Sequence, residues 1–290
     1  LTYGFAALPT ALAFLVGVGG SLYFNSVATI SFQAETIAMA GSLGKNIRER
    51  LSMVFWGAVF LLIPSLLGMN ELIVKWIGEA IVNSMMAGVG LMLANVAVDL
   101  CMSERYSGML SAVTALVVWF ITRDLAWTII LSVAAATALY NYLLRVRKMD
   151  IDRNSVNVSN EKFAFGAIEW RFWRNRRVLS GALAMACLNI GANISFGKIT
   201  GALAHLDANV DHLAIYSSLA DMVSTLFGGS PVESIISGTA TAPHPVISSV
   251  LMMGIMALLL LFRLLPFIGR YVHRSAISGF IFVLGVFVTF

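Results

Sequence analysis

The sequence predicts an all-α polytopic membrane protein, and three observations lead to that fold class. Of its 290 residues, 59% are hydrophobic and only 12% are charged, whereas a soluble domain is roughly 25% charged. Several windows of about 18 or more residues lack charge, which is enough to cross the hydrocarbon layer as a helix. The segments of about ten alternating residues that a transmembrane barrel requires are not evident.

The apolar spans follow one another along the whole chain. In order, they are expected at 5–24, 51–68, 81–100, 107–122, 125–144, 178–204, 212–227, 245–265 and 271–290. The stretches 25–44 and 228–244 are weaker, because Gly, Ser, Thr and Ala interrupt them, and they are too broken for ordinary spans. The chain starts at Leu1 and stops inside an apolar run, so we expect further helices at either end.

The stretch 145–177 is the longest polar one and carries nine of the 19 basic residues. The positive-inside rule therefore places it in the cytoplasm, between a first part at 1–144 and a second part at 178–290. Its "FAFGAIEWRFWRNRR" mixes aromatic residues with arginines, which is typical of a helix at the headgroup boundary or of a solvated connector with interfacial anchors. Basic residues placed between spans give no indication of nucleic-acid binding.

Crossing parity indicates that 228–244 traverses the membrane. Counted from the basic stretch, the basic residues near 45–50 come out on the inner side, and those near 263–274 do so only when 228–244 counts as one crossing. Lipid cannot satisfy broken backbone, so such a crossing must be enclosed by protein or must line a cavity.

The two weak stretches resemble each other and run in opposite directions. "TISFQAETIAMAGSLGKN" contains Glu35 and "GGSPVESIISGTATAPHP" contains Glu233, and each precedes a long apolar helix that ends near a proline and a glycine. Weak internal similarity with inverted topology is typical of secondary transporters, whose sites lie where interrupted helices meet. We therefore predict an inverted-repeat transporter fold with two interrupted half-helix crossings.

Glu233 is the principal candidate for a functional residue. In "SPVE", Ser230 fits an N-cap and Glu233 the third helical position, which is a capping box and predicts a half-helix over 231–242. Glu233 then either closes that cap only or serves a function, because an ionisable residue at bilayer depth is costly.

A polar stripe marks the span that contains "LNIGANISFGKITGAL". Asn189, Asn193 and Gly197 recur every four residues, which indicates one polar and small face, either for a site or for hydrogen bonds between helices. The adjacent Lys198 is expected to form an ion pair with Glu233 or Glu35.

Three further polar residues are weaker candidates. Glu35, with Gln33 as a companion amide, either lines the site or approaches the inner surface. Asp221 either carries protons or forms a structural hydrogen bond. The histidines and the two cysteines show no metal-ligand or disulfide spacing, and nothing indicates a cofactor.

At this point the sequence resembles a known family. "GGSPVESIISGTA" and "RERLSMVFWGAVFLLIPSLLGMNELIVKWIGEAIVNSMMAGVGLMLA" are similar to the xanthine/uracil permeases, the second nucleobase/cation symporter family, and especially to their hypoxanthine/guanine branch. The resemblance implies a seven-plus-seven inverted repeat, incomplete here, in the plasma (inner) membrane. It also implies a core domain that binds substrate and a gate domain often used for homodimers.

The resemblance also implies site residues. Glu233 would bind the N–H groups of a nucleobase, and Gln33, Gly229, Ser234, Phe196 and Gly197 would lie around it. The chain departs from the family at "SFGKITG", where many members have an acidic residue. That departure puts the substrate and the coupling ion in doubt.

The leading hypothesis is uptake of a purine or pyrimidine base, coupled to protons or Na⁺ by alternating access. The alternative is an anion or carboxylate transporter of the same fold, in which Lys198 and half-helix N-termini attract the cargo. An enzyme is not expected, because GxSxG and HExxH signatures are missing.

Overall fold

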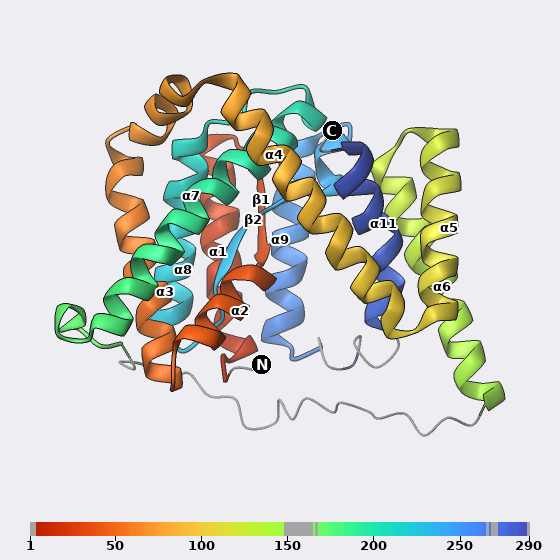
Figure 1. Cartoon of the computed structure of the whole chain (residues 1–290), viewed down its shortest axis with the longest axis horizontal. Coiled ribbons are helices and arrows are strands. Elements are labelled where there is room, and N and C mark those ends of the chain that lie inside the picture. The colour runs from red at the N-terminus through yellow and green to blue at the C-terminus, as the bar shows by residue number, and fades with distance from the viewer. Residues whose placement is uncertain (1–3, 148–164, 166–167, 265–266, 268–271, 289–290) are drawn as a thin grey trace. The chain divides into compact units, whose positions relative to one another are not determined.

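The computed structural model describes residues 4–147, 165, 168–264, 267 and 272–288. Helices make up most of it, as Figure 1 shows. They are α1 (Ala7–Phe24), α2 (Ala34–Leu43), α3 (Ile47–Leu66), α4 (Met69–Ser103), α5 (Arg105–Thr122), α6 (Leu125–Arg147), α7 (Arg176–Ala204), α8 (Val210–Leu226), α9 (Pro245–Leu261) and α11 (Ser278–Val283). Short turns of other helix types are η2 (Phe172–Arg174), η3 (Gly238–Thr241), η4 (Arg274–Ile277) and η5 (Leu284–Val288), and the strands are β1 (Thr29–Phe32) and β2 (Val232–Ile235).

Every expected apolar span coincides with helical structure. Among the described residues, five helices are long and apolar enough to cross a membrane, namely α1, α3, α5, α6 and α7. The chain is therefore a multi-pass membrane protein. The polar stretch expected at 145–177 lies partly outside the described residues, which resume fully at Ile168.

The chain forms two compact units, and each combines two segments that are separated in the sequence. The first comprises Leu1–Val82 and Asn157–Arg263, and the second Asn83–Val156 and Leu264–Phe290. Helix α4 passes from one to the other and is broken at Gly78, whose φ of 78° and ψ of 165° are not helical. The expected division at 1–144 and 178–290 describes sequence repeats and stays a prediction.

The first unit contains two halves that pack in reciprocal pairs. Helix α1 packs against α9 and α3 against α8, while α1 meets α8 and β1 meets β2. Each half has a helix that ends at a left-handed residue, Asn25 (φ 50°) or Gly228 (φ 86°), before its strand. These positions correspond, so Ile30 rather than Glu35 is the counterpart of Glu233. The pairing of the two acids across the repeats is therefore wrong.

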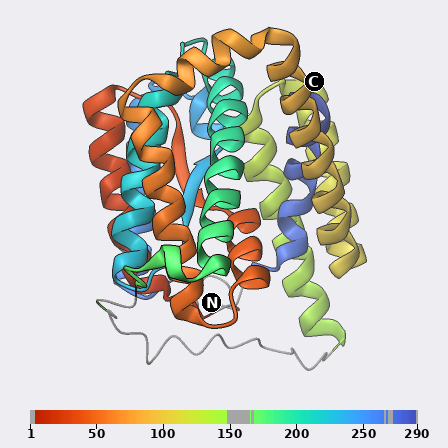
Figure 2. The ribbon, with the colours of Figure 1, turned by 60° about the vertical axis from the view of Figure 1, so that its left-hand side comes forward.

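The two crossings meet as an antiparallel pair of strands in the interior of this unit (Figure 2). Ser31 lies opposite Glu233, and Thr29 lies opposite Ile235. Helix α2 begins two residues after β1. The first crossing is therefore a strand followed by a half-helix.

The half-helix predicted over 231–242 is wrong, because β2 occupies its first half and only η3 is helical. A capping box would need the Ser230 backbone N–H, which instead donates to Thr10 Oγ1 at 2.8 Å. The next N–H, of Val232, donates to Asp221 Oδ1 at 2.6 Å. Both donors are held by neighbouring helices, and pairing with β1 then favours an extended backbone.

The second unit has a core built by close backbone approach. Its helices α5 and α6 pack together and against η4 and α11. A Cβ added at Gly279 would collide with the backbone oxygen of Ser111. Ser111 Oγ donates to the Ala276 carbonyl at 2.6 Å and accepts from the Gly279 N–H at 3.0 Å, which locks these segments together.

Candidate substrate and coupling site

The Glu233 carboxylate is enclosed in the first unit. Glu233 lies on β2 and is 1% exposed. The carboxylate accepts a hydrogen bond from the Ser234 N–H at 3.3 Å and interacts with the side chains of Ser217 and Asn193. A buried carboxylate is stable only when such polar groups replace water.

A second acid lies next to it. Asp221, on α8, is also 1% exposed, and its charge interacts directly with that of Glu233. Neither of these two buried acids forms an ion pair with a Lys or Arg among the described residues. The site thus holds two acids that repel each other whenever both are charged.

The predicted stripe on α7 faces this region. Asn193 Oδ1 accepts from Ser234 Oγ at 2.9 Å, and its Nδ2 donates to Ser217 Oγ at 3.4 Å. One turn earlier, Asn189 Oδ1 accepts from Thr36 Oγ1 of α2 at 3.3 Å. The stripe therefore joins α7 to α2, to α8 and to β2. These contacts agree with both interpretations, a site wall and hydrogen bonding between segments.

The other predicted residues on α7 are buried, and Lys198 is placed elsewhere. Phe196 is 6% exposed, and a Cβ at Gly197 would lie 3.0 Å from Leu213 Cδ2. Lys198 Nζ lies 3.8 Å from Glu71 Oε1, with both side chains partly exposed. The expected ion pair between Lys198 and Glu233 is wrong, because Lys198 pairs with Glu71 at the start of α4.

The start of α2 provides backbone donors beside β1. Gln33, 3% exposed, precedes the helix and makes no capping hydrogen bond. Its Oε1 instead accepts from Thr36 Oγ1. The first N–H groups of any helix lack intrahelical partners and carry a positive partial charge. The Glu35 side chain lies outside the described residues.

Gly229 has a packing role. A Cβ there would collide with Ser224 Oγ, and its N–H donates to the Ser224 carbonyl at 2.8 Å. A larger residue would push β2 away from α8. Its contact with a substrate stays a prediction.

Sequence reasoning missed a reciprocal cap at the other end of α8. Asp211 accepts from the N–H groups of Asn70 and Glu71, each at 2.9 Å. Glu71 Oε1 in turn accepts from the Val210 N–H at 2.8 Å. An acidic residue in the first turn of each helix was the available signal, but it does not identify the partner helix.

Comparison with solved structures identifies the fold. The transmembrane domain of a cyanobacterium bicarbonate transporter, BicA, superposes with a TM-score of 0.57 at 16% sequence identity, covering 98% of this chain and 85% of that one. No protein-family profile matches the sequence, and no curated protein matches it. The inverted-repeat transporter fold is thus confirmed. The assignment to the xanthine/uracil permeases is wrong, because the structural match is to a transporter of a different family.

Proposed function

We propose that this protein is a secondary transporter that carries a small anion, such as bicarbonate, across the plasma (inner) membrane by alternating access. The observation that carries the proposal is the pair of antiparallel strands, with α2 starting directly after β1 in the protein interior. The fold of a bicarbonate transporter supports it. Because the matching structure is that of a bicarbonate transporter, the comparison supports an anion rather than a nucleobase as cargo.

The start of α2 supplies the attraction for an anion. Helix N-termini bind carboxylates and oxyanions through free backbone N–H groups and the helix dipole. Gln33, which is buried, adds its side-chain N–H₂ group at this helix start, and the Thr36 hydroxyl donates to the Oε1 of that side chain. Such N–H donors suit a small oxyanion.

The acid pair supplies the coupling. A proton or a Na⁺ ion bound at Asp221 and Glu233 removes the repulsion between them, and it also removes the repulsion between Glu233 and an incoming anion. Anion and cation would then occupy the protein together and move in the same direction. We therefore expect symport.

The test is uptake of labelled bicarbonate, sulfate and formate into proteoliposomes, with imposed Na⁺ or pH gradients and empty liposomes as the blank. Glu233→Gln should abolish gradient-driven accumulation, while Glu104→Gln should keep it, because Glu104 caps α5 in the second unit. Accumulation by Glu233→Gln equal to that of the parent would remove the acid pair from the mechanism. Uptake of nucleobases but of no anion would refute the proposal.

A further inference from the structure

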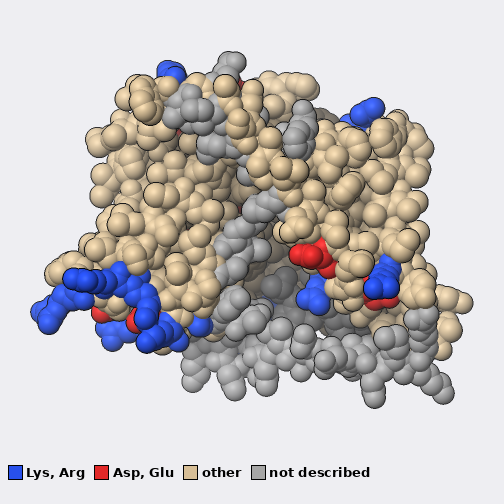
Figure 3. All heavy atoms as spheres, in the orientation of Figure 1, with Lys and Arg blue, Asp and Glu red and all other residues tan. Residues whose placement is uncertain are grey.

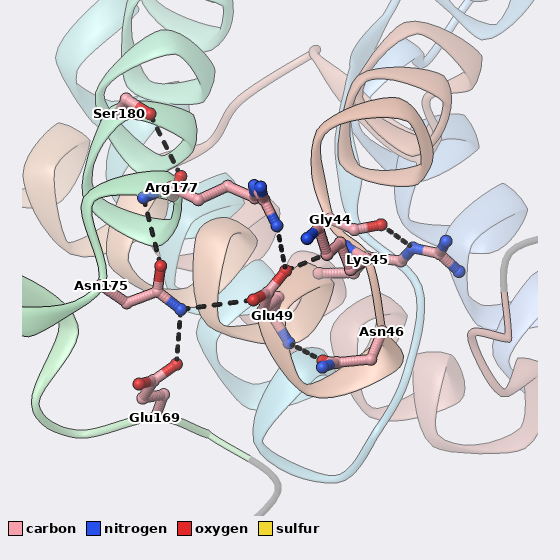
Figure 4. A network of polar contacts seen from close by, with 9 residues as sticks. Gly44, Lys45, Asn46, Glu49, Glu169, Asn175, Arg177 and Ser180 are labelled. Carbon is pink, nitrogen blue, oxygen red and sulfur yellow. Dashed lines mark hydrogen bonds and ion pairs between the residues drawn. The ribbon is translucent and has the colours of Figure 1, made fainter.

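Two of the candidate spans begin in one polar network (Figure 4). Asn46 Oδ1 accepts from the Glu49 N–H at 2.8 Å and caps α3. Asn175 Oδ1 accepts from the Arg177 N–H at 3.2 Å and caps α7. Because both spans start here, we expect this network to lie near the level where the chain enters the bilayer.

Glu49 links the two helix starts. Its Oε2 accepts from the Lys45 N–H at 2.9 Å and lies 3.7 Å from Arg177 Nη1. Its Oε1 accepts from Asn175 Nδ2 at 3.4 Å. The Glu49 carboxylate thus interacts with Lys45, Asn175 and Arg177, as Figure 4 shows.

The segment 168–177, which we call the ledge, is fixed to α3 by both backbone and rings. The Glu169 N–H donates to Ser52 Oγ at 2.7 Å, and Trp56 Nε1 donates to the Glu169 carbonyl at 3.1 Å. The ring centroids of Trp56 and Phe172 lie 4.1 Å apart. The ledge is therefore packed on the protein, and it is not a loose connector.

The ledge carries exposed indole rings and exposed arginines. Trp170 is 57% and Trp173 is 60% exposed. Arg171, Arg174 and Arg176 are also exposed, and none forms an ion pair within the described part of the chain. Figure 3 shows Lys and Arg side chains gathered at one edge of the molecule.

We propose that the ledge binds the headgroups of acidic phospholipids in the cytoplasmic leaflet. Indole rings are most stable at the boundary between hydrocarbon and water, so two exposed tryptophans beside two helix starts fit that depth. Guanidinium groups bind phosphate through paired N–H donors. Basic residues at this side of a membrane attract anionic lipid with about 1 kcal/mol each. Trp170 also packs against Phe55 and Trp56, but the exposed part of its ring is more stable at that boundary than in water.

The test measures binding of a fluorescent phosphatidylglycerol to the purified protein in detergent. Each arginine removed should weaken binding about 5-fold, and the triple variant Arg171→Gln, Arg174→Gln, Arg176→Gln on the order of 100-fold. Its matched control removes three exposed basic residues elsewhere, Lys75→Gln, Arg105→Gln and Arg123→Gln. If the triple variant aggregates, the three single variants replace it.

Competition experiments distinguish a lipid headgroup from free phosphate as the ligand. Unlabelled phosphatidylglycerol should displace the probe, while phosphatidylcholine and inorganic phosphate at equal concentration should not. The proposal is overturned if the arginine variants bind like the parent or if the control triple loses as much affinity. It is also overturned if free phosphate competes as well as the acidic lipid. None of these readouts depends on the cargo of the transporter.

Discussion

Replacing Asp211 by alanine should destabilise the first unit strongly. Asp211 is 5% exposed, and its carboxylate is the acceptor for two backbone N–H groups at the start of α4. Loss of an N-cap costs about 0.5–2 kcal/mol, and a buried donor left without a partner costs about 1–3 kcal/mol. We therefore expect Asp211→Ala to lower the free energy of unfolding by roughly 2–4 kcal/mol.

Thermal unfolding in detergent, followed by tryptophan fluorescence, measures this effect. For a unit of about 150–250 residues, each kcal/mol shifts the Tm by about 2–4 °C, so the drop should be roughly 5–15 °C. Asp211→Asn keeps one acceptor oxygen and should lose less than half as much. Asp207→Ala, which removes an exposed acid from the loop before α8, is the control. A Tm for Asp211→Ala within about 2 °C of the parent, or an equal drop in the control, would refute the reciprocal cap.

Four further substitutions test other parts of the structure. Lys198→Gln breaks a partly exposed ion pair and should cost less than about 1 kcal/mol in thermal unfolding, whereas a partner of Glu233 would cost several times more. Gly279→Ala should lose about 1–3 kcal/mol by overpacking, while Gly254→Ala, where a Cβ meets nothing within 4 Å, should gain about 0.5–1 kcal/mol as a better helix former. Burial and the charge of Arg274 lower the pKa of His273, against a smaller opposing effect of Glu104. The unfolded chain therefore binds that proton more readily, and the Tm of the second unit should fall as the pH drops below about 6.5, a slope that His273→Gln should reduce.

The membrane spans were predictable because hydropathy is a local property. Each apolar run had to become a helix to satisfy its own backbone in lipid, and α1, α5 and α6 fall within a few residues of their expected bounds. The strands were not predictable in the same way. Four residues starting at Val232 carry little pattern, and "SPVE" matches a capping box as well as it matches a strand. What decides between them is Thr10 and Thr29, which lie about 200 residues away in the sequence.

The candidate site was predicted in part for the same reason. Glu233 and the stripe through Asn193 stood out, because polar groups are rare in apolar spans, and both are buried in the structure. The partner of Lys198 did not stand out, since Glu71 belongs to another helix and follows a short loop. Sequence shows which groups need partners, but pairing across more than a hundred residues needs the fold.

The polar residues of the site also hold the two strands in place, and this double role determines which variants are informative. A pair of strands has two outer edges, and unpaired backbone groups there would be costly inside a membrane protein. Asp221 accepts from Val232 N–H on one edge, and Thr200 Oγ1 donates to the Ile235 carbonyl at 3.4 Å. Asp221→Leu would therefore lose structure and charge together. Asp221→Asn keeps an acceptor for Val232 and removes only the charge. A variant that retains its Tm but loses coupled uptake would assign Asp221 to coupling, and loss of both would leave it as a support for β2.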